Sequence, residues 1–175
     1  GAPETPETIS ETAGKVILPP NTSIDLNVLT VNSPVQEDQT EDGEFSVSVT
    51  GYNIPQFVTN PEGEVVMMGF PHPASDNFDI NVESTALGMI MTLPTVLFLS
   101  DEGKSDMVQR VLNDPLFPEF VAQVESSVAQ NASLFDTTNT ALFDAMTALL
   151  VSSTSKSAKS GDNLPVNFIR GGFGG

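Results

Sequence analysis

The amino-acid sequence predicts an α+β fold, in which an antiparallel β-sandwich of about six or seven strands is followed by a small bundle of about four helices. The first observation is a change of hydrophobic period near Ser84. Before this residue, apolar side chains mostly alternate with polar ones, as in half-buried strands. After it, they recur every third or fourth residue, as in amphipathic helices. The second observation is a turn signal about every 8–12 residues in the first half, which favours a sandwich.

The composition divides the chain into four segments. Residues 1–13 are rich in Pro, Thr and Glu and are expected to form a disordered tether. Residues 14–82 carry the predicted sandwich, and residues 83–153 carry the predicted helices. Residues 154–175 begin as a Ser/Lys-rich linker, and Leu164–Ile169 then alternates once more. A terminal strand is therefore expected there, able to pair with a sheet edge or with another chain.

Three strands are expected in the first part of the sandwich. Lys15–Leu18 is an apolar run that two prolines stop, Ile24–Val28 alternates apolar with polar residues, and Phe45–Val49 alternates apolar residues with serines. Between the last two, Gln36–Asp42 is acidic and is followed by Gly43, so this stretch is expected to be a loop that ends in a turn.

A hairpin and a last strand complete the predicted sandwich. Gln56–Thr59 and Val65–Phe70 flank Asn60-Pro61-Glu62-Gly63, whose residue types are typical of a hairpin loop. Phe78–Val82 alternates once more and leads into the helical half, so the last strand is expected to end where the first helix begins.

The first helix is expected to be the central, buried one. Its residues from Ala86 onward are apolar nearly all round, which is typical of a helix that other elements surround. Ser84 can cap it, because a serine hydroxyl accepts an unpaired backbone N–H of the first turn. Pro94 is expected to end or kink it.

Three more helices are expected after Pro94. Ser100 or Asp101 begins the second, Pro118 lies at the start of the third, and Asp136 or Thr137 caps the fourth. Short links between them imply antiparallel neighbours. The residues expected to face the core are Leu87, Ile90, Met91, Val108, Val111, Leu112, Phe117, Phe120, Val121, Val124, Val128, Leu142, Ala145, Met146, Leu149 and Leu150.

The chain is strongly acidic, with 23 Asp and Glu residues against 6 Lys and Arg and a formal net charge of −17. This charge repels phosphate backbones and anionic lipids, so no nucleic-acid partner is expected. The absence of cysteine rules out disulfides and thiolate metal sites. The longest apolar stretch, Ala86–Leu99, is interrupted by a proline and is too short to span a bilayer.

Three segments of the first half resemble a known family. They are Gly14-Lys15-Val16, Ile24–Leu29, and Thr40-Glu41-Asp42-Gly43-Glu44-Phe45-Ser46-Val47-Ser48-Val49. In this order they resemble the opening strand, the extended strand and the turn with its following strand of carboxypeptidase regulatory-like (transthyretin-like) β-sandwich domains. Asp and Gly accept the backbone angles of such a turn. The resemblance covers residues 14–82, but the family's Gly-Tyr pair stands directly after the Phe45 strand, as Gly51-Tyr52.

The helical half, from Ile80 to Phe117, is similar to the segment that follows such sandwiches in some uncharacterised bacterial lipoproteins. This resemblance implies a location in the bacterial cell envelope or outside the cell, a lipid anchor upstream of Ala2, and no catalytic residues. The lipid-bearing cysteine of such proteins is absent from this sequence.

No residue of the sequence is assigned as catalytic. His72, the one histidine, would be a general base if a carboxylate such as Asp76 oriented it, but a surface residue is the plainer interpretation. No serine lies in a Gly-x-Ser-x-Gly elbow, so Ser84 is interpreted as a helix start rather than a nucleophile. Carboxylates are plentiful enough for a hydrolytic pair, but no pattern nominates the two.

The acidic stretch at residues 37–44 is the one candidate metal site. Ca²⁺ takes six to eight oxygen ligands from a compact loop, but the EF-hand pattern fails here at Thr40 and Val49. A solvated loop is the alternative, and no other cofactor is expected. The weak candidates for calcium are Glu37, Asp38, Glu41, Asp42 and Glu44.

The sequence thus predicts a non-catalytic binding or scaffold module of the cell envelope or of the secreted proteins, with a protein or glycan partner. Two alternatives stay open. One is a Ca²⁺-stabilised adhesion module that uses the acidic stretch, and the other is an acidic hydrolase with a pair of carboxylates.

Overall fold

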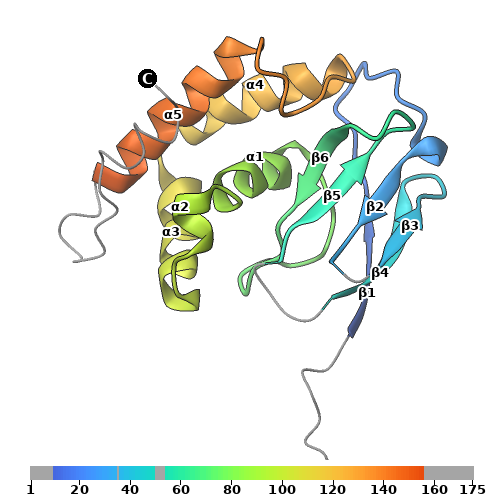
Figure 1. The fold of residues 1–175 in the computed structure, drawn as a ribbon, viewed down its shortest axis with the longest axis horizontal. Helices are drawn as coiled ribbons and strands as arrows, with labels where there is room; N and C mark the ends of the chain where they lie inside the picture. The colour runs from blue at the N-terminus through green and yellow to red at the C-terminus, as the bar shows by residue number, and fades with distance from the viewer. Residues whose placement is uncertain (1–9, 35, 50–53, 156–175) are drawn as a thin grey trace, which may run out of the picture.

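The computed structural model describes residues 10–34, 36–49 and 54–155, and it confirms an α+β fold. Figure 1 shows the strands on one side of the molecule and the helices on the other. The strands are β1 (Ser10–Lys15), β2 (Thr30–Asn32), β3 (Glu37–Gln39), β4 (Glu44–Val49), β5 (Gln56–Thr59) and β6 (Val65–Gly69). The helices are α1 (Val82–Met91), α2 (Pro94–Leu97), α3 (Asp101–Asn113), α4 (Phe117–Ala129) and α5 (Thr140–Ser155), with a 3-10 helix at Leu26–Val28.

The described strands form two small antiparallel sheets. β1 pairs with β4, and the other four strands follow the order β3-β2-β5-β6. The hairpin expected around residues 60–63 is confirmed as β5 and β6, and the strand expected at Phe45–Val49 is confirmed within β4. The sandwich of six or seven strands is not confirmed, because the sheets among the described residues have two and four strands.

Two segments of the first half differ from the sequence-based expectation. Ile24–Val28 is not a strand: the Asp25 carboxylate accepts the Asn27 N–H at 2.9 Å, and this local bond competes with strand pairing. Glu37–Gln39, expected to lie in a loop, is strand β3 at the edge of the four-stranded sheet. Charged side chains are common on such edges because they prevent pairing with other chains.

The predicted first and last strands are also corrected. Of Lys15–Leu18, only Lys15 belongs to β1, which begins at Ser10 and so includes part of the segment expected to be a tether; residues 1–9 lie outside the described residues. Of the last strand, predicted at 78–82, only Ile80 pairs, in one parallel bridge with Val16. The strand cannot continue because α1 already begins at residue 82.

Helix α1 lies between the sheet and the other helices. It packs on β6 and also contacts α3 and α4. Its residues from Thr85 to Met91 are all buried, which confirms the expected central helix. The buried apolar side chains form one hydrophobic cluster that runs from Val16 near the strands to Leu150 in α5. The segments 14–82 and 83–153 therefore share one core.

The start of α1 differs from the expectation, because Asn81 rather than Ser84 is its N-cap. Asn81 Oδ1 accepts the Ser84 N–H at 2.8 Å, and Ser84 Oγ accepts the Asn81 N–H at 2.9 Å. This reciprocal pair is a capping box, which satisfies two backbone donors at once. At the other end, α1 stops at Met91, and Pro94 is the first residue of α2.

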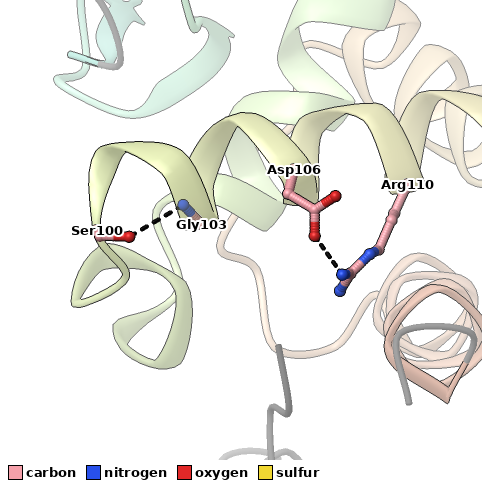
Figure 2. A network of polar contacts seen from close by, with 4 residues as sticks. All are labelled: Ser100, Gly103, Asp106 and Arg110. Carbon is pink, nitrogen blue, oxygen red and sulfur yellow. Dashed lines mark hydrogen bonds and ion pairs between the residues drawn. The ribbon is translucent and has the colours of Figure 1, made fainter. Parts of the chain in front are cut away.

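The start of α3 is confirmed. Figure 2 shows Ser100 Oγ accepting the Gly103 N–H, at 3.1 Å, and one turn later the ion pair between Asp106 and Arg110. The expected core face is corrected in one place, since Leu112 keeps 38% of its surface exposed.

The last helix begins later than expected. Asp136 Oδ1 accepts the Thr138 N–H at 2.9 Å within a turn, and Asn139 Oδ1 accepts the Leu142 N–H at 3.3 Å at the helix start. The helix then continues to Ser155, past the predicted end at residue 153. The expected terminal strand at residues 164–169 lies outside the described residues. Within the described ranges, no helix has both the length and the apolarity that a membrane span requires.

Candidate functional site

A pocket of about 160 Å³ lies where β5 and β6 meet the loop of residues 70–81 and the helices α1 and α3. This loop connects β6 to α1 and supplies most of the walls. The lining residues are Gln56, Gly69, Phe70, Pro71, His72, Ser75, Asn77, Phe78, Asp79, Glu83, Ser84, Leu87 and Leu112. We term it the Gln56 pocket.

Short-range hydrogen bonds shape the loop that covers the pocket. Ser75 Oγ accepts the His72 N–H at 3.0 Å, and the Ser75 N–H donates to the His72 carbonyl at 2.8 Å, which closes a turn. Further on, Asn77 Oδ1 accepts the Asp79 N–H at 2.9 Å. Ser and Asn side chains favour such turns because they bond to backbone groups a few residues away.

The end of the loop is attached to the strand side of the molecule. The Lys15 N–H donates to Asp79 Oδ1 at 3.0 Å. The Ile80 N–H donates to the Lys15 carbonyl at 2.9 Å, and the Ile17 N–H donates to the Ile80 carbonyl at 2.8 Å. Lys15 and Ile17, which are distant in sequence, thus hold the end of the loop through backbone hydrogen bonds and through the Asp79 side chain. These bonds place Asp79 at the pocket.

The wall formed by α1 is held against the edge of the sheet. β6 is the last strand of its sheet, so one side of its backbone needs partners other than a strand. Helix α1 provides them at Met68: the Met68 N–H donates to Thr85 Oγ1 at 3.1 Å, and Ser84 Oγ donates to the Met68 carbonyl at 2.8 Å. These bonds fix the first turn of α1, and with it Glu83 at the pocket.

The side chain of Gln56 is the unusual feature of this pocket. It is fully buried, and neither its amide nitrogen nor its amide oxygen has a hydrogen-bond partner in the described structure. Leaving a buried polar group without a partner costs about 1–3 kcal/mol, so such groups call for an explanation. Gln56 lines the pocket, but neither amide atom is exposed to it, so a ligand there reaches the unpaired amide only when a neighbouring side chain shifts.

The titratable side chains that line the pocket are His72, Asp79 and Glu83. Burial lowers the pKa of His72 below its ordinary value of 6.5, because removal from water disfavours the charged imidazolium. The imidazole is therefore neutral near pH 7, and the pocket carries two carboxylates with no opposing cation among its lining residues.

No protein-family model, no curated protein and no solved structure matches this chain. The chemistry of the pocket is therefore the basis on which a function can be proposed. Of the two residues that the sequence suggested as a general base and its partner, His72 lines the pocket. Asp76 is not among the lining residues. The sequence patterns did not indicate Gln56, Asp79 or Glu83. In the sequence each of these is only a polar residue next to an apolar run.

The five calcium candidates lie near the β3–β4 turn, and none of them lines this pocket. Within residues 10–34, 36–49 and 54–155, no three Asp, Glu or His side chains gather in a way that could hold a metal ion. Asp38 is engaged by the backbone, since its Oδ2 accepts the Ser46 N–H at 2.9 Å. The exposed candidates are Glu37, Glu41, Asp42 and Glu44.

The turn between β3 and β4 is formed by Asp42-Gly43, as the sequence predicts. Asp42 and Gly43 both have positive φ, 52° and 88°, as the two central residues of a tight hairpin turn require. Glu41 and Glu44 close this turn through two backbone hydrogen bonds of 2.9 and 3.0 Å. Turn formation accounts for these residue types, and the arrangement of the carboxylates does not itself favour calcium.

Proposed function

We propose that this chain is a non-catalytic binding module and that the Gln56 pocket recognises its ligand. The observation that carries this proposal is the fully buried Gln56 amide, which lines the pocket without a hydrogen-bond partner in the described structure. A ligand that bonds to this amide supplies the hydrogen-bond partner that the described residues do not. Sites of this kind also discriminate strongly, because a ligand that lacks the matching group leaves the amide unpaired.

The size of the pocket favours binding of a small group over catalysis on a large substrate. Pockets for drug-sized ligands measure about 300–1,000 Å³, and this one measures about 160 Å³. The alternative of an acidic hydrolase would use the two carboxylates of Asp79 and Glu83. A pocket of this volume encloses one small group of a ligand rather than a whole sugar ring or peptide, which favours binding of that group over hydrolysis.

The location of the protein belongs to the same proposal. The resemblance of residues 14–82 to carboxypeptidase regulatory-like sandwiches favours a cell-envelope or secreted module. In that setting a small pocket near a sheet edge would receive one side chain of a protein partner or a free small molecule. A calcium-stabilised adhesion module is the less favoured alternative, since no observation of the site points to a metal.

Titration of the ¹⁵N-labelled protein with three small probes tests the proposal. Acetamide, acetate and n-butylammonium are added separately, and the backbone amide signals of Gln56, Gly69, His72 and Ser75 are followed by NMR. We expect saturable shifts of these signals with at least one probe, and their loss in Gln56→Met. If none of the three probes gives saturable shifts at the pocket, the proposed function is wrong.

A further inference from the structure

We infer that the Gln56 pocket binds a primary ammonium group carried on a short alkyl stem. This inference rests on the proposed function, because it specifies the ligand of the same pocket. Three properties of the lining residues carry it: their charge, the unpaired amide, and the size and apolarity of the walls.

The charge of the pocket favours a cation. Asp79 and Glu83 line it, and no Lys or Arg is among its lining residues. Lys15 bonds to Asp79 through its backbone N–H. A cleft lined by one sign of charge raises the local concentration of the opposite charge, and the overall charge of −17 adds to this attraction.

His72 does not oppose a cation near neutral pH. Burial holds its pKa below 6.5, so the ring is uncharged there. An uncharged imidazole has one nitrogen that accepts a hydrogen bond, and an ammonium group has three donors and no acceptor. His72 thus adds an acceptor to the pocket without adding a competing positive charge.

The unpaired amide supplies a further acceptor. Gln56 Oε1 has no hydrogen-bond partner in the described structure, and bonds between a neutral acceptor and an ionised donor are stronger than neutral ones. An ammonium in the pocket meets the carboxylates of Asp79 and Glu83, and it donates to this buried oxygen once a neighbouring side chain has shifted. A carboxylate ligand would meet those two side chains with the wrong charge.

The volume limits the group that enters the pocket to a few atoms. A cavity of about 150 Å³ holds a benzene molecule, which has six non-hydrogen atoms, and this pocket measures about 160 Å³. Its apolar lining includes Phe70, Phe78 and Leu87. An unbranched alkyl stem of three or four carbons fits such walls, so a lysine side chain and a free alkylamine share the required chemistry.

Isothermal titration and NMR at low ionic strength test the inference with four probes. n-Butylammonium stands for a free amine, Nα-acetyl-lysine methylamide for a lysine side chain, and acetamide and acetate for other ligand classes. For ligands of this size we expect dissociation constants of about 1 mM. If n-butylammonium binds at least as tightly as the lysine derivative, a free amine is the ligand; tighter binding of the lysine derivative assigns a protein partner.

A matched pair of variants separates pocket charge from overall charge. Glu83→Gln removes an exposed carboxylate at the pocket, in the first turn of α1. Glu119→Gln removes an exposed carboxylate in the first turn of α4, away from the pocket. We expect Glu83→Gln to weaken binding of n-butylammonium about two- to fivefold, as for a partly exposed ion pair. Glu119→Gln should leave it unchanged.

Two outcomes overturn the inference. One is tighter binding of acetamide or acetate than of n-butylammonium, which would leave the proposed function standing with a different ligand. The other is equal weakening by Glu83→Gln and Glu119→Gln, which would show that the amine senses only the net charge of the protein. If none of the four probes binds at the pocket, both the inference and the proposed function fail.

Discussion

Gln56 and Gly69 face each other as cross-strand partners in β5 and β6, and the missing side chain of Gly69 leaves room for the Gln56 amide. A Cβ at residue 69 would lie 3.0 Å from Gln56 Oε1 and 2.9 Å from Ile80 Cγ1. Both distances are too short for a carbon atom, so Gln56 or Ile80 would have to move. Glycine at this position therefore preserves both the packing of Ile80 and the place of the amide at the pocket.

Gly69→Ala should destabilise the protein and disturb the pocket. Overpacking a buried site costs about 1–3 kcal/mol, because neighbouring side chains must leave their preferred rotamers. Chemical denaturation measures the loss of unfolding free energy. Gly63→Ala is the control: its φ of 81° makes alanine strained, but nothing lies within 4 Å of the added Cβ. Only Gly69→Ala should change probe binding; an unaltered pocket in Gly69→Ala would contradict the packing described here.

Thr85→Val should destabilise more than Thr85→Ser. Valine keeps the shape of threonine but leaves the buried Met68 N–H without the acceptor that it bonds at 3.1 Å. An unpaired buried donor costs about 1–3 kcal/mol. Serine retains the hydroxyl and loses one methyl group, for about 1 kcal/mol. Thermal and urea unfolding of both variants decide the order; a more stable Thr85→Val would show that the helix α1 does not protect the sheet edge through this bond.

Ser152→Ala should loosen the contact between the end of α3 and α5. The Asp114 carboxylate is 3% exposed, and its Oδ2 accepts the Ser152 hydroxyl at 2.7 Å. A hydrogen bond to a charged group contributes about 1.5–3 kcal/mol. We expect a loss of this order in unfolding free energy. Ser155→Ala, on the exposed last residue of α5, should have little effect, and a similar loss in both variants would count against a role for the Asp114 bond.

The pKa of His72 predicts how stability changes with pH. In the unfolded chain the imidazole takes up a proton near 6.5, but in the folded protein burial delays this to lower pH. The unfolded state therefore binds more protons in this window, and stability is lost as pH falls through it. His72→Gln should flatten the decline between about pH 7 and pH 5. Equal slopes for both proteins would contradict a buried imidazole.

The helices could largely be predicted from the sequence because their signals are local. Phe117, Phe120 and Val124 recur at helical spacing, and all three are buried in α4. Ser100 caps α3 as expected. The start of α1 was misplaced because Asn81 and Ser84 are both good cap residues, and only the geometry of the capping box distinguishes them.

The strands were harder to predict because pairing partners lie far away in sequence. Ile24–Val28 has the alternation of a strand, but Asp25 bonds its own neighbour and the segment turns instead. Glu37–Gln39 has no apolar alternation, and it forms a strand because β2 offers an edge for pairing. Edge strands carry little hydrophobic signal, so periodicity misses them.

The pocket could not be predicted from the sequence. In the sequence, Gln56 is simply a polar residue at the start of a strand. Its burial depends on the loop 70–81 and on α1. Asp79 and Glu83 reach the same pocket only because the loop is attached to Lys15 and α1 is attached to Met68. The acidic stretch at 37–44 is conspicuous in the sequence because it holds five carboxylates within eight residues, whereas Asp79 and Glu83 are two separate acids that only the fold places beside Gln56 and His72.

The unfolding free energy of Gln56→Met, measured together with its binding of n-butylammonium, tests the central claim most directly. Methionine has nearly the shape of glutamine and needs no hydrogen bond, so it should stabilise the protein by about 1–3 kcal/mol. It should also weaken ammonium binding about tenfold or more, because a bond to a charged donor is lost. Higher stability with lost binding would confirm that Gln56 is held unpaired for a ligand. Lower stability with unchanged binding would contradict this account.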